Sequence, residues 1–346
     1  MRVRGQQDAP TIRKILSLDG CGVRGLSTIM VLRYIMKILE EQRGVKLEPW
    51  QEFDMIGGAS TGGLIAIMLG RLRMSLDECE AAYLTLSQRI FTPTHSKANI
   101  PGCPYNFLQA DGKFDSKLLE DGIKEILRDH YLPETELLKE NGSDACKVFV
   151  CAVHGNDATA VIRSYQARAY DRLLDVCKIW EAARATSATS RLFEPITVGP
   201  FQQKFVDGAL GHNNPIDLAD SESSGIWPQQ DRLIISIGAG NAPGKSVDSN
   251  ILDLVQTLAE IATDTEERNN IFRATHPDMV KNDRLFRFNV YHGLADVGLE
   301  EYNAVDRIAD HTDHYLGQYD TAREIEKCVD AMRSGGQRLN FIGGEG

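Results

Sequence analysis

The sequence lacks three features that would assign it to common functional classes. Basic residues are not in excess, because 38 lysines and arginines stand against 49 aspartates and glutamates and give a net charge of −11. The seven cysteines include no Cys-x-x-Cys pair, and apolar runs such as 64–69 are far shorter than the roughly 20 residues that cross a bilayer. We therefore expect no nucleic-acid partner, no metal site and no membrane-spanning segment.

The same features bear on location. Residues 1–11 are polar and lack the apolar stretch of a secretion signal. An odd number of cysteines favours reduced thiols and hence a reducing compartment. We expect a cytoplasmic protein without a cofactor. Because an acidic chain gains little from an anionic leaflet, any membrane contact should be transient, peripheral and mostly hydrophobic.

Apolar segments alternate with helical patterns along the chain. A hydrophobic share of 42% and a charged share of 25% are those of a globular protein. Strand-like runs occur at 12–19, 53–59, 147–153, 160–165, 204–206 and 233–237. Helical patterns separate most of them, as at 26–38, where Gly44 should stop the helix, and this predicts an α/β fold with α/β/α layers and a largely parallel central sheet. Residues 12–240 should form the core, with 241–346 a mostly helical extension packed on the same domain.

One segment, 91–114, contains three prolines and two glycines and has no clear period. Segments of this length within a domain are typically lids or binding loops, and a plain surface excursion is the alternative. Its apolar residues Ile100, Tyr105, Phe107 and Leu108 favour a lid or a lipid-facing rim.

The run Gly58-Ala59-Ser60-Thr61-Gly62 fits the Gly-x-Ser-x-Gly pattern of a serine nucleophile on a sharp turn. It lies between an apolar strand and an apolar helix, where flanking glycines let the backbone pass a strained serine. The Thr61 amide and the start of the helix would then face developing negative charge. The alternative is a glycine-rich turn in which Ser60 only caps the helix.

The run Gly20-Cys21-Gly22-Val23-Arg24-Gly25 matches Gly-x-Gly-x-x-Gly, which is typical of dinucleotide-binding folds. That interpretation predicts a nucleotide-binding regulator or an oxidoreductase, and it needs an acidic residue at the end of the second strand. Glu40 and Glu41 have nearly the right separation but belong to the predicted helix. The loop can instead offer N–H groups to an acyl oxyanion. Arg24 then fixes the loop, faces a phosphate head group or lies on a solvent-exposed helix surface.

The run Asp207-Gly208-Ala209 ends a predicted strand, so Asp207 should reach the carboxyl edge of the sheet together with Ser60. Asp207 is a candidate general base, with an ordinary Asp-Gly turn as the alternative. His212 follows closely and could be mistaken for the base of a histidine-containing triad. Its place beyond a glycine turn favours a dyad of Ser60 and Asp207 alone.

The three motifs, beginning at Asp19, Gly58 and Asp207, resemble those of the patatin-like phospholipase family in sequence, order and approximate spacing. The run Ala185-Thr186-Ser187-Ala188 also looks like that family's segment before its catalytic aspartate. The resemblance spans about residues 12–240, and the sequence around the motifs is similar to fungal relatives of calcium-independent phospholipase A2.

The resemblance implies a patatin-like α/β/α fold and a serine lipid acyl hydrolase of the phospholipase A or lysophospholipase type. It would cleave membrane phospholipids or other fatty-acyl esters through an acyl-enzyme, without metal or cofactor. The implied catalytic dyad is Ser60 and Asp207. The implied oxyanion hole comprises Gly20, Cys21, Gly22, Arg24 and Thr61, and the motif glycines are Gly25, Gly58, Gly62 and Gly208. An effector module of a larger receptor is the alternative that is not an enzyme, and no motif bears on oligomeric state.

Two places depart from the family's pattern. Cys21 stands where the family usually has glycine, so a positive φ there would strain the loop by about 1–2 kcal/mol. Ser190 and Arg191 stand where many relatives have proline and tyrosine-like residues, which leaves the wall of the acyl-chain pocket unassigned.

Overall fold

The computed structural model describes residues 12–91, 114–142, 144–154, 158–167, 171–188, 193–208, 212–240, 265–294, 297–298 and 301–334. The predicted lid between Phe91 and Phe114, together with Ser190, Arg191 and Ala209, lies outside these ranges. The two flanking phenylalanines lie inside them and meet edge to face, with ring centroids 5.0 Å apart.

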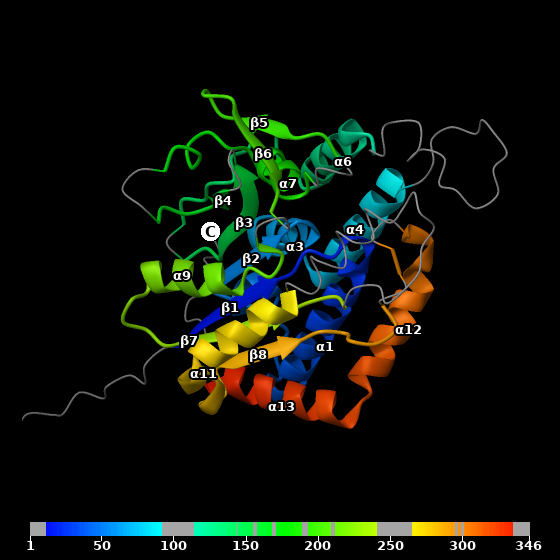
Figure 1. The fold of residues 1–346 in the computed structure, drawn as a ribbon, viewed down its shortest axis with the longest axis vertical. Coiled ribbons are helices and arrows are strands. Elements are labelled where there is room, and N and C mark those ends of the chain that lie inside the picture. The colour runs from blue at the N-terminus through cyan, green and yellow to red at the C-terminus, as the bar shows by residue number, and fades with distance from the viewer. Residues whose placement is uncertain are drawn as a thin grey trace, which may run out of the picture.

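One sheet lies at the centre of the described structure (Figure 1). Its strands are β1 (Arg13–Leu18), β2 (Met55–Ala59), β3 (Lys147–His154), β4 (Ala158–Arg163), β5 (Ile196–Val198), β6 (Gln203–Asp207), β7 (Arg232–Ile237) and β8 (Leu285–Phe288). The order is β5-β6-β3-β2-β1-β7-β8, and β4 also pairs with β3. Pairing is parallel from β3 through β2, β1 and β7 to β8, and antiparallel for β4, β5 and β6. The predicted largely parallel sheet is confirmed.

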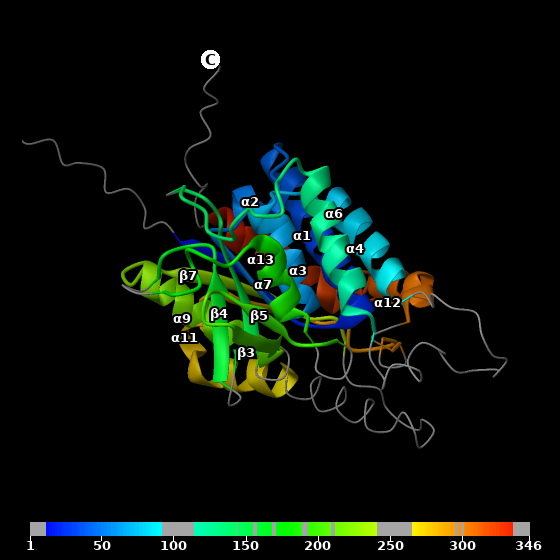
Figure 2. The same cartoon turned by 90° about the horizontal axis from the view of Figure 1, so that it is seen from above.

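Helices cover both faces of this sheet (Figure 2). They include α1 (Gly25–Arg43), α2 (Pro49–Glu52), α3 (Thr61–Ala66), α4 (Leu76–Phe91), α6 (Ser116–Asp129), α7 (Ile179–Thr186), α9 (Ile216–Ile226), α11 (Pro277–Lys281), α12 (Val305–Leu316) and α13 (Tyr319–Ser334). Along β1, Leu16 and Leu18 pack in the cluster beneath α1, whereas Ile15 packs in the cluster beneath α9 and α11. The three-layer α/β/α prediction is therefore confirmed. Within the described ranges, no helix is long and apolar enough to cross a membrane.

The end of α1 lies where the sequence predicts it. Gly44 takes a φ of 71°, and its N–H donates to the Glu40 carbonyl at 2.8 Å, an arrangement that glycine adopts at low cost. Glu40 and Glu41 therefore lie in the last turns of a helix. They do not follow a strand, where a ribose-binding acid would have to lie.

The C-terminal elements share their core with the N-terminal ones. β8 pairs in parallel with β7, and α12 and α13 contact α1. Ile308 of α12 and Val329 of α13 belong to the same buried cluster as Leu32 of α1. The Arg43 guanidinium donates to the Met332 carbonyl at 3.0 Å. The last helices thus help to bury the helix that follows the first glycine loop.

Candidate active site

Two strand ends meet on one edge of β3. β4 pairs with β3 over Phe149–His154 and takes up one edge, so β2 and β6 share the other. β2 pairs with the first part of that edge, where Ala59 lies opposite Cys151. β6 pairs with the last part, where Asp207 lies opposite Ala152. β2 and β6 run in opposite directions, so their carboxyl ends point toward each other.

This arrangement brings Ser60, directly after β2, beside Asp207, the last residue of β6. Asp207 does lie at the carboxyl edge of the parallel strands, but β6 reaches this edge from the opposite direction. The reason is that β5 and β6 form a hairpin, which reverses the chain without a crossover helix.

Ser60 occupies a sharp turn between β2 and α3. Its φ of 52° and ψ of −126° cost a non-glycine residue about 1–3 kcal/mol. A Cβ at Gly58 would collide with the Gly62 carbonyl, and a Cβ at Gly62 would collide with the carbonyls of Leu18 and Asp19. The Gly-x-Ser-x-Gly spacing therefore lets the turn pack against β1. Ser60 occupies the N-cap position of α3, but its side chain makes no capping hydrogen bond to the helix.

The Ser60 hydroxyl instead donates to Asp207, with 2.9 Å between Oγ and Oδ2. Ser60 is 9% exposed and Asp207 is 1% exposed. The Asp207 N–H donates to the Ala188 carbonyl at 3.0 Å, and Gly208 lies so close to the Cys151 carbonyl that a Cβ would strike it. The carboxylate is thus held by its backbone, in contact with the hydroxyl of a strained turn.

His212 lies close to Asp207 in the sequence, and it forms hydrogen bonds to Thr159 and Gly208. Its Nδ1 is 2.8 Å from the Thr159 hydroxyl on β4, and its N–H donates to the Gly208 carbonyl at 2.8 Å. The hydrogen-bond partner of the Ser60 hydroxyl is a carboxylate and not an imidazole.

The first glycine loop lies against the serine turn. The Gly20 N–H donates to the Asn213 carbonyl at 3.1 Å, and the Cys21 N–H donates to the Thr61 hydroxyl at 3.0 Å. Two of the predicted oxyanion donors therefore have acceptors within the protein. Among the described residues, none accepts a hydrogen bond from the Gly22 N–H.

Cys21 does not strain this loop. Its φ of −155° suits any residue, and the positive φ of 56° falls on Gly22. Burial raises the pKa of the Cys21 thiol to about 11, and the hydroxyls of Thr61 and Thr28 lie 3.7 and 3.8 Å from its sulfur. The thiol is a neutral packing group that also fixes the loop.

Two further side chains hold the loop from below. The Tyr83 hydroxyl of α4 donates to the Gly22 carbonyl and packs so closely on Gly25 that a side chain there would collide with it. Arg24 is 4% exposed, and its Nη1 donates to the Leu294 carbonyl at 3.3 Å. The solvent-exposed alternative for Arg24 is therefore wrong, and its contact fits a residue that fixes the loop.

Other residues that shape this site were not predicted from the sequence. Asn213 donates through Nδ2 to the Gly20 carbonyl at 2.9 Å, and its own carbonyl accepts from the Gly20 N–H, so it holds the first glycine loop through both polar groups of Gly20. Its place in the polar run after Asp207 was the available signal. No sequence pattern indicates Tyr83 or Arg287. Each contacts the loop or the residue before it from an element distant in sequence that carries no motif.

Arg287 on β8 forms a buried ion pair with Asp19, the residue before the loop. Its two terminal nitrogens lie 3.0 and 2.7 Å from the two carboxylate oxygens, and both side chains are at most 4% exposed. Glu266 also accepts from this guanidinium, at 2.6 Å from Nη2. One cation thus faces two carboxylates. Burial, together with the nearby Glu266, raises the pKa of Asp19 to about 6, although Arg287 opposes this.

This raised pKa predicts a pH-dependent stability. The folded protein holds a proton on Asp19 below about pH 6, whereas the unfolded chain releases it near 3.8, so the stabilisation is present at low pH and is lost as pH rises through 6. In urea unfolding, the free energy of unfolding of the wild type relative to Asp19→Asn should fall by about 2 kcal/mol between pH 4 and pH 7. A constant difference over this range would show that Asp19 stays ionised in the folded protein.

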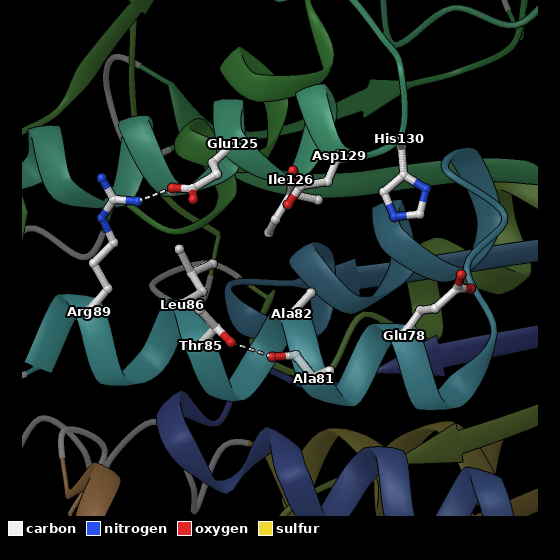
Figure 3. Close-up of a pocket in the computed structure, with 11 residues that line it drawn as sticks. Glu78, Ala81, Ala82, Thr85, Leu86, Arg89, Glu125, Ile126, Asp129 and His130 are labelled. Carbon is white, nitrogen blue, oxygen red and sulfur yellow. Dashed lines mark hydrogen bonds and ion pairs between the residues drawn. The ribbon is translucent and has the colours of Figure 1, made fainter.

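A groove of about 340 Å³ between α4 and α6 is separate from this site (Figure 3). Arg89 of α4 forms an ion pair with Glu125 of α6 across it. None of the motif residues lines this groove. Within the described ranges, no group of three or more histidine, cysteine or acidic side chains is arranged to hold a metal ion.

Several known proteins are similar to this chain, and two of those similar in sequence are named as phospholipases. "Phospholipase A I" of Arabidopsis thaliana is 26% identical to this chain over an alignment of 353 residues, gaps included. The alignment covers 86% of this chain and 26% of the relative. "Calcium-independent phospholipase A2-gamma" of Mus musculus is 29% identical over 288 residues, which cover 80% of this chain and 34% of the relative. The chain thus spans about a quarter to a third of the length of these curated relatives. The solved structure of VipD from Legionella pneumophila aligns with 94% of this chain and 75% of its own, at 10% identity and a TM-score of 0.37.

The profile of the family described as "Patatin-like phospholipase" matches residues 16–220, more than half of the chain. This span contains both glycine motifs and the Asp207 motif. The chain therefore belongs to the patatin-like phospholipase family.

Proposed function

We propose that this chain is a serine lipid acyl hydrolase of the phospholipase A or lysophospholipase type. The observation that carries the proposal is the 2.9 Å hydrogen bond from Ser60, on a turn with a φ of 52°, to the buried carboxylate of Asp207. Membership of the family and the phospholipase names of the relatives support a fatty-acyl ester as the substrate class.

Two residues handle the proton in this mechanism. The Ser60 oxygen attacks the ester carbonyl carbon while its proton passes to Asp207. When the bond to the alcohol breaks, Asp207 gives this proton to the leaving oxygen. Water then attacks the acyl-enzyme, Asp207 takes a proton from it and returns it to Ser60, and the fatty acid leaves.

The oxyanion is assigned to the N–H groups of Gly22 and Thr61. The Thr61 N–H is the first of α3, and such groups have no acceptor within their helix. The hydrogen bond from the Cys21 N–H to the Thr61 hydroxyl fixes the first glycine loop against the start of α3, and so fixes the Gly22 and Thr61 N–H groups relative to each other. Gly20, Cys21 and Arg24 are assigned to holding the loop, because each has a protein partner. Backbone donors fixed in this way stabilise developing charge without reorganising.

The proposal includes one domain and a cytoplasmic setting. Residues 12–240 and 241–346 are proposed to act as a single unit, since β8, α12 and α13 share a core with α1. The six cysteines among the described residues are buried and form no disulfide with one another, which supports a reducing compartment. Contact with a membrane phospholipid surface would be transient and peripheral.

The test is fatty-acid release by the purified chain from phosphatidylcholine vesicles and from a soluble short-chain ester. Release from either substrate by the wild type, with none by Ser60→Ala, supports the proposal. A folded wild type that releases fatty acid from neither would contradict it.

Hydrolysis should also persist in excess EDTA, because the proposed dyad and backbone donors supply the proton acceptor and the charge stabilisation. The measurement compares initial rates before and after chelation, and then after calcium is added back. A reversible loss that calcium restores would show that the reaction depends on a metal ion.

A further inference from the structure

Thr186, the last residue of α7, connects the two halves of the proposed dyad. Its hydroxyl oxygen accepts a hydrogen bond from the Ser60 N–H at 2.9 Å. Its carbonyl accepts from the Gly208 N–H at 3.4 Å, directly after Asp207. Thr186 is 0% exposed. One buried residue therefore contacts the backbone of both the serine turn and the aspartate turn.

The contact to Ser60 falls where the turn needs it. A serine with a φ of 52° is held in a sparsely populated conformation, which persists only when its surroundings fix it. The Ser60 N–H lies ahead of α3, so no helical carbonyl accepts from it. Without the threonine oxygen, this buried donor would lose its partner.

The methyl group of Thr186 orients the hydroxyl. At Gly63, in the first turn of α3, an added Cβ would lie 2.7 Å from Oγ1 and 2.8 Å from Cγ2 of Thr186. Both branches of the side chain therefore rest on the backbone of α3, which restricts rotation about χ1. Glycine at position 63 makes this close approach possible.

We propose that Thr186 is a positioning residue, which holds Ser60 in the conformation that directs its hydroxyl to Asp207. This inference rests on the proposed function and adds a residue to it. In the proposed mechanism, Thr186 touches neither the ester nor the transferred proton. It acts through the Ser60 backbone.

The test compares Thr186→Val, which keeps the shape and removes the acceptor, with Thr186→Ser, which keeps the hydroxyl. Valine should lower kcat by about 10- to 100-fold and leave KM within about twofold. The reason is that the buried Ser60 N–H loses its acceptor, so the Ser60 hydroxyl is no longer held in line with Asp207. Serine should keep kcat within about threefold of the wild type. The labelling rate of Ser60 by a fluorophosphonate should follow kcat/KM.

Thr312→Val is the matched control. Thr312 on α12 is also 0% exposed. Its hydroxyl donates to the Ile308 carbonyl at 2.7 Å and lies 2.8 Å from the Ser27 hydroxyl, away from Ser60. This change should lower the melting temperature as Thr186→Val does, yet leave kcat unchanged. If Thr186→Val does not fold, Thr186→Ala removes the same acceptor with less bulk beside Gly63 and should show the same loss relative to serine.

Two results would overturn the role of Thr186. One is a folded Thr186→Val protein, or alanine in its place, with the kcat and labelling rate of the wild type. The other is an equal loss of kcat in Thr312→Val, or in Thr186→Ser, because the effect would then not depend on the acceptor to Ser60. A wild type that neither hydrolyses esters nor reacts with the probe would instead contradict the proposed function itself.

Discussion

Replacing Ser60 with alanine should abolish ester hydrolysis, with a loss of about four orders of magnitude or more, and leave the fold intact. Alanine has no nucleophile, and the remaining N–H groups can only polarise a carbonyl for attack by water. The change removes one atom from a tight turn, so it adds no crowding at Gly58 or Gly62. Fatty-acid release, together with circular dichroism and thermal unfolding, measures both parts of this expectation.

Ser223→Ala is a suitable control for that experiment. Ser223 is a buried serine of α9, and its hydroxyl donates to the Ala219 carbonyl at 2.7 Å. Its removal should leave hydrolysis unchanged. A well-folded Ser60→Ala protein that keeps wild-type activity would rule out the serine mechanism.

Asp207→Asn should lower kcat by about 10³- to 10⁴-fold, and His212→Ala should lower it by no more than about threefold. Asparagine has nearly the shape of aspartate and still hydrogen-bonds, but it cannot take the Ser60 proton. His212→Ala removes the contact to Thr159 on β4. That contact takes no part in the hydrogen bond between Ser60 and Asp207. Steady-state rates of the folded variants, on one soluble ester, give the comparison.

The pair of variants separates two mechanisms. Equal loss in pure, folded His212→Ala and Asp207→Asn would mean that a histidine serves as the base, and the dyad would be wrong. Thermal unfolding of both proteins shows whether each loss comes from chemistry or from a damaged fold.

Local patterns predicted most of the elements that carry the site. The apolar run before Gly20 is β1, the helix that ends at Gly44 is α1, and the run before Ser60 is β2. Each of these depends on side-chain periodicity and on glycine at one turn, which are properties of neighbouring residues. The motif spacing also placed Ser60 and Asp207 at strand ends, where the structure has them.

Long-range features had no such local pattern. The direction of β6 depends on the β5–β6 hairpin and on which edge of β3 is available for pairing. Neither can be predicted from residues 203–207. The pairing of Asp19 with Arg287 joins residues 268 positions apart. The Gly20 N–H donates to Asn213 and the Cys21 N–H donates to Thr61, and both hydrogen bonds likewise depend on contacts between separate turns. Such features arise when the sheet assembles.

Labelling with a fluorophosphonate shows whether Ser60 is the nucleophile, because this probe forms a stable bond with an activated serine. Mass spectrometry of the digested wild type should find the label on the peptide that contains Ser60, with no label in Ser60→Ala and much slower labelling in Asp207→Asn. A folded wild type that remains unlabelled, or that carries the label on another residue, would contradict the assignment of Ser60 and Asp207 as the catalytic pair.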